Sequence, residues 1–298
     1  MIPNREVTAL VCTACPRQCG ANRETGRGYC GAPAAFKVAR AAKHFWEEPC
    51  ISGTDGSGTV FFSGCSLRCV YCQNLEISHG CFGKELTDKE LLRVFDRLIE
   101  AGAHNINLVN PTHYAERLAP LLRAYRCPVP VVYNSSGYEH VQTLQKLEGL
   151  VDIYLPDLKY CTADAARLYS GAADYFPVAA AAIKEMKRQQ PDDVFQNGLL
   201  RRGVILRHLI LPKNTNRSVE ILRFIADAFG TETIVSLMAQ YTPCGELSAF
   251  PELQRRITAR EYEKVVAALE DLGFENAYIQ ERTAASEDFI PAFDLTGI

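Results

Sequence analysis

The sequence has no run of about 18 consecutive apolar residues, the length that a membrane-spanning helix needs. Its first twenty residues also lack the basic and then apolar pattern of a secretory signal peptide, so we expect a cytoplasmic protein. The net charge of −3 is too small to create the broad basic surface with which proteins bind nucleic acids or anionic membranes. Partners therefore have to be inferred from individual sites.

Cysteine, in contrast, is abundant, with twelve in 298 residues. A reducing cytosol disfavours disulfides, so metal binding is the expected use of closely spaced thiols. Seven cysteines form two groups, Cys12, Cys15, Cys19 and Cys30 and then Cys65, Cys69 and Cys72. The other five are scattered and are interpreted as small buried apolar side chains: Cys50, Cys81, Cys127, Cys161 and Cys244.

The hydrophobic pattern predicts an α/β fold. Short β-rich runs alternate with helical segments, which implies parallel strands with helical crossovers in a barrel, a partial barrel or an open sheet. Strands are predicted at 36–40, 59–63, 106–110, 130–134, 151–155, 203–211, 233–238 and 276–280. Helices are predicted at 88–102, 114–125, 139–149, 174–190, 219–230 and 260–273. We expect residues 1–50 to form a small Cys-rich metal-binding module and residues 51–298 to form the main domain.

Polar segments follow the predicted strands at the points where the strands end. They read GCSLRC, NPTH, NSSG, PDLK and AQYT. Ligands of barrels and open parallel sheets are held at the carboxyl ends of the strands. The five segments therefore predict one binding site at this end of the sheet.

The loop with Cys65, Cys69 and Cys72 predicts an iron–sulfur cluster. A cubane cluster uses four ligands, so three thiolates leave one iron open for a substrate, as catalytic zinc keeps an open position. A zinc site completed by His79 or His44 is the alternative. Zinc knuckles, however, usually pair two C-x2-C units, and this loop has C-x3-C with C-x2-C.

The motif GCSLRCVYCQN resembles the C-x3-C-x2-C signature of the radical S-adenosylmethionine (radical SAM) superfamily, including an aromatic residue before the third cysteine. The preceding ISGTDGSGTVFFSGC is similar to the lead-in of glycyl-radical-enzyme activases. GAHNINLVNPTHY, VDIYLPDLKY and SLMAQYTP resemble a stand-alone subgroup, similar to pyruvate formate-lyase activating enzyme, with a Cys-rich N-terminus. The resemblance covers about residues 51–280.

The resemblance implies a partial (β/α)6 TIM-like barrel of the radical SAM type. Cys65, Cys69 and Cys72 would hold a [4Fe–4S] cluster whose open iron binds SAM. An electron from a flavodoxin- or ferredoxin-type reductant would cleave SAM to methionine and a 5′-deoxyadenosyl radical. The radical would abstract hydrogen from a protein or peptide substrate such as a glycyl radical enzyme.

The resemblance also assigns SAM-binding positions after the first three strands. Tyr71 is expected to lie against the adenine. Many members have a Gly-Gly-Glu stretch that receives the amino group of SAM, where this chain has Asn110, Thr112 and His113. Backbone carbonyls and Thr112 are therefore the candidates for this contact. His113 either contacts SAM or the substrate or caps the next helix. Asn134 and Ser135 stand where activases have an Asp-Thr-Asn-Gly segment that helps to bind a monovalent cation, a role that Asn134 weakens by lacking the charge.

Later strands contribute the remaining SAM-binding candidates. Asp157 and Lys159 keep the Asp-Leu-Lys triplet of activases and are expected to pair and face the cofactor. Arg207 matches an arginine that meets the SAM carboxylate, which suits a guanidinium that can grip a carboxylate with two hydrogen bonds. Gln240 lies near the place of a SAM-contacting histidine.

The N-terminal group Cys12, Cys15, Cys19 and Cys30 has ligand-like spacing. Its composition fits either a structural zinc site or a second iron–sulfur cluster, and does not separate them. For the whole protein, an activase-like radical SAM enzyme is the leading hypothesis. A radical SAM enzyme that modifies a peptide side chain or a small metabolite is the alternative, and a non-catalytic iron–sulfur electron carrier fits less well.

Overall fold

The sheet is built mainly from parallel strands that follow one another in chain order. The computed structural model describes residues 11–284 and 291–298. The parallel strands are β2 (Ser57–Phe62), β4 (Ile106–Val109), β5 (Val131–Ser135), β6 (Ile153–Pro156), β8 (Leu199–Leu209), β9 (Ile234–Met238) and β10 (Ala277–Ile279). Each of the seven predicted parallel strands is therefore present, and the helical crossovers between them are confirmed.

Three strands join the sheet in antiparallel orientation: β1 (Phe36–His44), β3 (Lys84–Leu86) and β7 (Val194–Gln196). The sheet order is β10-β9-β8-β6-β5-β4-β2-β1-β3, with β7 paired to β8. Among the described residues no pairing joins β10 to β3 or to β1, so the barrel is partial, as predicted. Because β1 pairs with β2, part of the 1–50 segment belongs to the main sheet; the module boundary at residue 50 stays a prediction.

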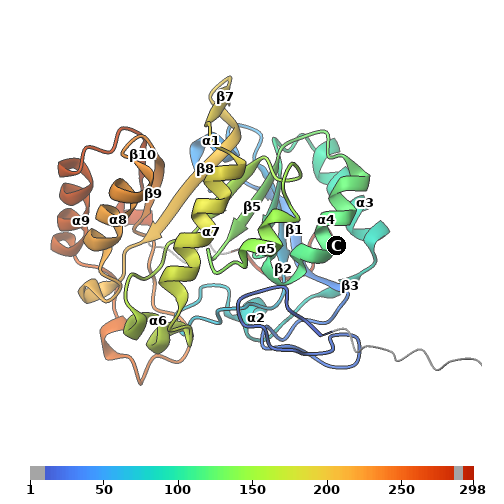
Figure 1. The fold of residues 1–298 in the computed structure, drawn as a ribbon, viewed down its shortest axis with the longest axis horizontal. Coiled ribbons are helices and arrows are strands. Elements are labelled where there is room, and N and C mark those ends of the chain that lie inside the picture. The colour runs from blue at the N-terminus through green and yellow to red at the C-terminus, as the bar shows by residue number, and fades with distance from the viewer. Residues whose placement is uncertain (1–10, 285–290) are drawn as a thin grey trace, which may run out of the picture.

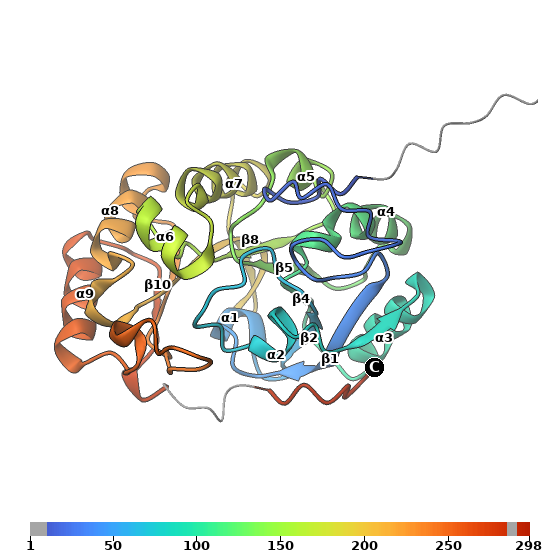
Figure 2. The same ribbon diagram turned by 90° about the horizontal axis from the view of Figure 1, so that it is seen from below.

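Helices cover the outer side of the curved sheet, as Figures 1 and 2 show. They are α3 (Asp88–Glu100), α4 (Ala115–Tyr125), α5 (Val141–Gln145), α6 (Ala163–Ser170), α7 (Tyr175–Gln189), α8 (Ser218–Phe229) and α9 (Ala259–Asp271). Short helices α1 (Pro49–Ser52) and α2 (Leu75–Ser78) flank β2. Strands β2, β5 and β6 are buried along their whole length, which is typical of parallel strands covered on both faces.

The helix predicted at 139–149 is shorter than expected. After α5, the backbone N–H groups of Lys146, Leu147 and Glu148 bond to carbonyls three residues back, so the chain continues as tight turns. The predictions also missed α6 and the β7–β8 hairpin. The hairpin projects from the rest of the chain in Figure 1.

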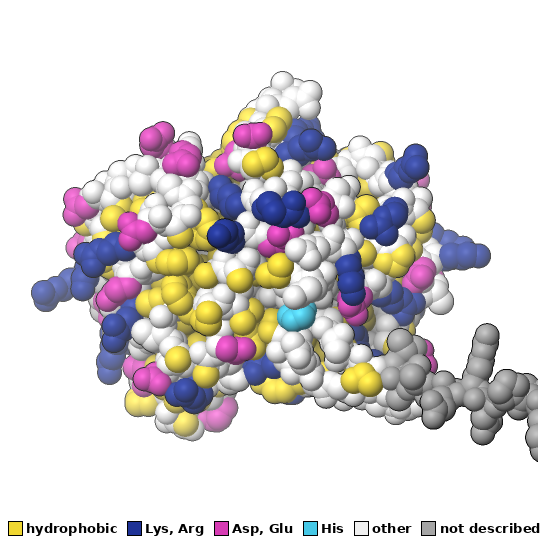
Figure 3. Space-filling model, viewed as in Figure 1, with side chains coloured by type: hydrophobic (Ala, Val, Ile, Leu, Met, Phe, Trp, Pro, Cys, Tyr) yellow, Lys and Arg dark blue, Asp and Glu magenta, His cyan; other side chains and the backbone are white. Residues whose placement is uncertain are grey.

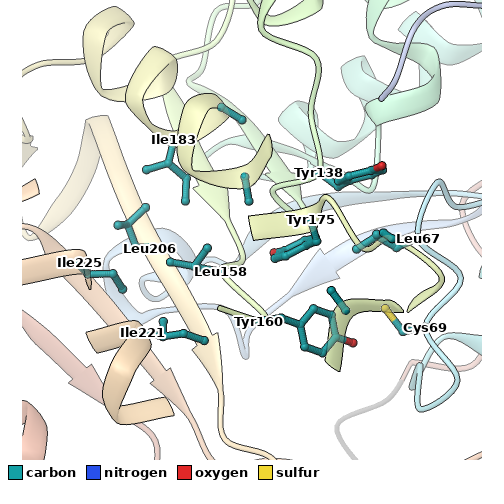
Figure 4. Close-up of a cluster of buried hydrophobic side chains, with 14 of the residues drawn as sticks. Leu67, Cys69, Tyr138, Leu158, Tyr160, Tyr175, Ile183, Leu206, Ile221 and Ile225 are labelled. Carbon is teal, nitrogen blue, oxygen red and sulfur yellow. The ribbon is translucent and has the colours of Figure 1, made fainter. Parts of the chain in front are cut away.

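The main core lies between the sheet and the outer helices. Figure 4 shows aliphatic side chains of β8, α7 and α8 on one side of it and aromatic side chains on the other, where Tyr160 and Tyr175 lie next to Cys69. The core thus reaches the cysteine loop and gives it a rigid, apolar support. On the outer face, acidic and basic side chains are interspersed, in agreement with the small net charge (Figure 3). No helix of the described residues is long and apolar enough to cross a membrane.

Candidate functional site

The three-cysteine loop begins where β2 ends, and a neighbouring loop fixes its first residues. Asn110 donates from Nδ2 to the carbonyl of Gly64 at 2.5 Å, and Nε2 of His113 lies 2.8 Å from the carbonyl oxygen of Ser63. Burial lowers the pKa of His113 to about 3, so its imidazole is neutral and can donate from Nε2. The segment after β4 therefore holds the two residues that precede Cys65.

Each thiol of the loop accepts a hydrogen bond. Cys65 Sγ accepts from two backbone N–H groups of its own loop at 3.4 and 3.5 Å. Cys69 Sγ accepts from the hydroxyl of Ser170 at 2.9 Å, and Cys72 Sγ from the hydroxyl of Ser78 at 3.3 Å. Cys65 and Cys69 are buried and Cys72 is half-buried. Donors aimed at sulfur favour a thiolate, the form that binds metal.

Burial of these thiols determines their protonation when no metal is bound. Burial, and then the neighbouring Cys69, raise the pKa of Cys65 to about 11 and that of Cys72 to about 12, so without metal both stay protonated. No three His, Cys, Asp or Glu side chains in the described parts of the chain converge as a single metal ion would require. A cubane does not require that convergence, because each of its thiolates binds a different iron atom.

The cysteine loop faces a cavity of about 560 Å³ inside the partial barrel. Eight of the predicted site residues line the cavity: Cys69, Tyr71, Cys72, Asn134, Asp157, Lys159, Arg207 and Gln240. They come from the cysteine loop and from the ends of β5, β6, β8 and β9. The structure thus brings together side chains that the sequence separates by up to 171 positions, from Cys69 to Gln240.

A buried ion network crosses this cavity. Arg207 donates from Nε to Asp157 Oδ1 at 2.9 Å and from one terminal nitrogen to Asn134 Oδ1 at 2.6 Å; its other terminal nitrogen lies 3.4 Å from Glu47 Oε2. Lys159 Nζ lies 2.5 Å from Asp157 Oδ2, so the predicted pairing is confirmed. Burial opposes ionisation, but the charges of Arg207 and Lys159 hold the pKa of Asp157 below its usual range. Asp157 and its two cationic partners, Arg207 and Lys159, therefore remain charged.

The remaining predicted site residues contact other parts of the protein. They are not among the described residues that line the cavity: Cys65, Asn110, Thr112, His113 and Ser135. Thr112 donates to Glu139 Oε1 at 2.5 Å, and Ser135 Oγ accepts from the N–H of Gly137 at 3.2 Å. The alternative that His113 caps the following helix is wrong, because α4 begins after Tyr114 without a side-chain cap.

Among the lining residues that were not predicted from the sequence are Trp46, Glu47 and Glu48. They lie between β1 and α1, so they approach the cavity from the side opposite the cysteine loop. Glu47 accepts from Nδ2 of Asn107 at 3.1 Å, and Glu48 is only 8% exposed. Two adjacent carboxylates between Trp and Pro, directly before the buried short helix α1, are the signal that could have found them.

The N-terminal cysteines lie together in a compact loop. Cys15 and Cys30 are buried, Cys12 is half-buried and Cys19 is exposed. Burial raises the pKa of Cys15 to about 12, and the thiols of Cys12 and Cys30 add to the effect, so these side chains are close enough to interact. Like the thiols of the three-cysteine loop, these do not converge in the described structure as a single metal ion would require, so zinc and a second cluster both stay predictions.

Arg17 connects this N-terminal loop to the cysteine loop. Its guanidinium donates to three backbone carbonyls, those of Ser66 at 2.7 Å, Gly171 at 2.5 Å and Ser170 at 2.8 Å. Ser170 is also the residue whose hydroxyl bonds to Cys69. One side chain therefore holds together the two cysteine-containing segments.

Comparisons with known proteins agree with this geometry. A model described as a 4Fe-4S single cluster domain matches residues 51–164. Pyruvate formate-lyase-activating enzyme of Clostridium pasteurianum is 52% identical over 186 residues, covering 58% of this chain and 70% of that protein. An uncharacterized protein of Methanocaldococcus jannaschii is 29% identical over 279 residues, covering 90% of this chain and 76% of that protein.

Among solved structures, the [FeFe]-hydrogenase maturase HydG has a TM-score of 0.52 at 15% identity, over 78% of this chain and 53% of that chain. This likeness concerns the fold alone, and the chain spans about half the length of HydG. The fold, the cysteine loop and the cluster-domain match together define a radical SAM enzyme. The chain belongs to the radical SAM superfamily, in the family of the pyruvate formate-lyase-activating enzyme.

Proposed function

We propose that this protein cleaves SAM reductively at a [4Fe–4S] cluster and uses the resulting radical to abstract hydrogen from the backbone of a glycyl radical enzyme. The observation that carries this proposal is the position of the cysteine loop. The loop lies at the carboxyl ends of the parallel strands and faces a cavity with a charged wall. An electron carrier would need four ligands and no such cavity.

Cys65, Cys69 and Cys72 would hold the cluster, which supplies the electron that converts SAM to methionine and a 5′-deoxyadenosyl radical. The chain holds this loop through side chains of two other segments, the one after β4 and the end of α6. Asn110 and His113 fix its start, and Ser170 bonds to the sulfur of Cys69. We therefore assign Asn110 and His113 to positioning the cysteine loop.

The polar wall of the cavity is proposed to bind SAM. Arg207, Asp157 and Lys159 hold fixed charges of both signs, which suits the carboxylate and ammonium groups of an amino acid. Tyr71 is fixed by a 2.7 Å hydrogen bond between its hydroxyl and that of Tyr160, and both rings are buried. A wall that is already rigid costs little reorganisation when the cofactor binds.

The remaining polar candidates from the sequence support this wall. Asn134 accepts from Arg207, and Gln240 Oε1 accepts from Nε2 of Gln280 at 2.9 Å at the cavity edge. Thr112 and Ser135 are bonded within the layer behind the cavity, so we assign them to positioning the wall. A flavodoxin- or ferredoxin-type protein is proposed as the electron donor.

The test is anaerobic reconstitution with iron and sulfide, followed by SAM and dithionite. The wild-type protein should form 5′-deoxyadenosine, and Cys69→Ala should form none, because the cluster loses a ligand. Cys127→Ala is the matched control, since this half-buried cysteine lies outside both cysteine groups, and it should keep full activity. Product formation that persists in Cys69→Ala would refute the proposed cluster site.

Substrate class needs a separate measurement. With a glycyl radical enzyme of the same organism present, the activated protein should show a glycyl radical signal by electron paramagnetic resonance. If 5′-deoxyadenosine forms without that signal, the peptide side-chain or metabolite hypothesis becomes the better one.

The N-terminal cysteines are proposed to hold a second metal centre. About eight irons per chain would indicate a second cluster, whereas about four irons and one zinc would indicate a zinc site. The count should be made on wild type and on Cys15→Ser, in which the additional metal is lost and the first cluster stays.

A further inference from the structure

A chain of hydroxyl groups leads from the wall of the cavity to the sulfur of Cys69. The hydroxyl of Tyr71 lies 2.7 Å from that of Tyr160, and the hydroxyl of Tyr160 lies 2.7 Å from that of Ser170. Ser170 Oγ in turn lies 2.9 Å from Cys69 Sγ. The two O···O distances have the most frequent value for hydrogen bonds between hydroxyls. Tyr71 lines the cavity, and Figure 4 shows Tyr160 beside Cys69, so the chain connects the cavity wall with a cluster ligand.

Proton counting fixes the direction of each bond in this chain. A thiolate bound to iron carries no proton, so Ser170 has to donate to Cys69. A hydroxyl has a single proton, so Tyr160 has to donate to Ser170, and Tyr71 has to donate to Tyr160. Burial holds the pKa of both phenols well above the ordinary value, so both keep their proton. The three O–H groups therefore all point along the chain toward the sulfur.

The end of α6 holds the serine against the cysteine loop. The backbone N–H of Val70 donates to the carbonyl of Tyr169 at 2.9 Å, and Arg17 donates to the carbonyl of Ser170 at 2.8 Å. The three residues that carry the hydroxyls are at most 6% exposed. Hydrogen bonds that follow one another in such a low-dielectric interior polarise and strengthen each other. The tyrosines therefore strengthen the bond from Ser170 to the sulfur without touching the sulfur themselves.

Cys69 receives the shortest hydrogen bond of the three thiols in the loop. The donors to Cys65 lie at 3.4 and 3.5 Å and the donor to Cys72 at 3.3 Å, compared with 2.9 Å for Cys69. Reduction adds one electron to the cluster and makes its thiolate sulfurs more negative. Hydrogen bonds to the sulfurs are one of the properties that set the reduction potential of a cluster, because donors stabilise the more negative, reduced form. The chain of hydroxyls is therefore placed to favour reduction.

We propose that Tyr160 and Tyr71 are positioning residues that raise the reduction potential of the cluster by acting through Ser170 on Cys69. This inference rests on the proposed function, because it takes Cys69 as a ligand of the cluster that cleaves SAM. One electron enters the cluster from the reductant, and no proton leaves the chain of hydroxyls. The role of these tyrosines is thus to set how easily the cluster accepts that electron.

The test is a redox titration of the reconstituted full-length protein with titanium(III) citrate, followed by electron paramagnetic resonance. The signal followed is the one that is lost in Cys69→Ala, so a second metal centre does not contribute. Tyr160→Phe keeps the ring and removes the middle hydroxyl. At the midpoint potential of the wild type, the ratio of reduced to oxidised cluster should be about threefold lower in this variant, which corresponds to about 28 mV for one electron.

Tyr169→Phe provides the matched control. Tyr169 stacks on Tyr160 with ring centroids 6.4 Å apart, but its hydroxyl donates to Glu252 at 2.6 Å, outside the chain. This variant loses the same atom from the same aromatic cluster, so its midpoint potential should equal that of the wild type. Adding Tyr160→Phe to Ser170→Ala should cause no further change, because the chain is already interrupted next to the sulfur.

A variant with the opposite sign keeps the test decisive if Tyr160→Phe incorporates the cluster poorly. Tyr160→3-fluorotyrosine keeps the hydroxyl and makes it a stronger donor, so the midpoint potential should rise. The inference is overturned by a Tyr160→Phe midpoint equal to that of the wild type, an equal drop in Tyr169→Phe, a further drop when Tyr160→Phe is added to Ser170→Ala, or no rise with 3-fluorotyrosine. A protein whose potentials follow these expectations but that forms no 5′-deoxyadenosine would refute the proposed function and not the role of the hydroxyl chain.

Discussion

Replacing Arg207 by alanine removes the one guanidinium that bonds to both Asp157 and Glu47. These side chains are 15%, 12% and 10% exposed, so the network is largely desolvated. Removing one partner of a buried ion pair leaves an uncompensated charge and costs about 3–5 kcal/mol. Lys159 still neutralises part of the charge on Asp157, so we expect a loss of about 3 kcal/mol in the free energy of unfolding, measured in urea on metal-free protein at pH 8.

The loss in Arg207→Ala should depend on pH. In the wild type, Arg207 and Lys159 overcome the effect of burial and hold the pKa of Asp157 low, so this stabilisation is present near neutral pH and is lost as pH falls through the acidic range. In the variant, burial dominates and raises the pKa of Asp157, and it raises further the pKa of Glu47, which burial already holds above its usual range in the wild type. A carboxyl group whose pKa is raised in the folded protein adds stability at low pH, and this contribution is lost as pH rises. The stability deficit of the variant relative to wild type should therefore be smaller at pH 5 than at pH 8.

Arg188→Ala provides the matched control. Arg188 also bonds to two carboxylates, those of Glu148 and Glu185, but its side chain is 51% exposed. Exposed ion pairs contribute about 0–1 kcal/mol, so this variant should lose little stability. If Arg207→Ala is no less stable than Arg188→Ala, or if its deficit is the same at pH 5 and pH 8, the reasoning about a desolvated network is refuted.

Three further variants test other features. Gly137→Ala should destabilise the protein by more than 2 kcal/mol in urea unfolding, because φ is +75° and a Cβ would lie 2.2 Å from a carbonyl oxygen; Gly149→Ala, with φ of +73° and no atom within 4 Å, should lose only about 1 kcal/mol. Burial raises the pKa of Glu139 to about 7, so wild type should lose up to ~3 kcal/mol as pH rises from 4.5 to 8, and Glu139→Gln should show a flatter profile. Ser170→Ala removes the donor to Cys69 and should lower the reduction potential of the reconstituted cluster, measured by redox titration; an unchanged potential would contradict the proposed role of that bond.

The layout of the sheet was predictable because it depends on local patterns. β-rich runs bounded by turn residues located β2, β4, β5, β6, β8, β9 and β10, and polar residues after the strands located the cavity. The β7–β8 hairpin also had a local signal that was not used, since Asn197 and Gly198 both have positive φ, as a two-residue Asn-Gly turn requires. Only the first half of β1 was predicted, because Ala41 to His44 have weak strand propensity and form a strand by pairing with β2.

The part of the site that could not be predicted depends on contacts between distant residues. Glu47 looks like a surface acid in the sequence, and only its approach to Arg207, 160 positions later, shows that it is buried. His113 was expected near a ligand or at a helix start, and the sequence does not show that it contacts Ser63 in the loop after the neighbouring strand β2. A pattern of neighbours along the chain carries no information about which polar groups meet in a low-dielectric interior.

Arg17 has a consequence for how the protein matures. It lies between Cys15 and Cys19, and its bonds to the carbonyls of Ser66 and Ser170 end whenever that loop moves away. Through these bonds the N-terminal loop restrains the three-cysteine loop, the segment that is proposed to receive iron and sulfide. On the proposal that both cysteine groups bind metal, we expect the three-cysteine loop to be loaded before the N-terminal cysteines, because Arg17 ties the two segments together.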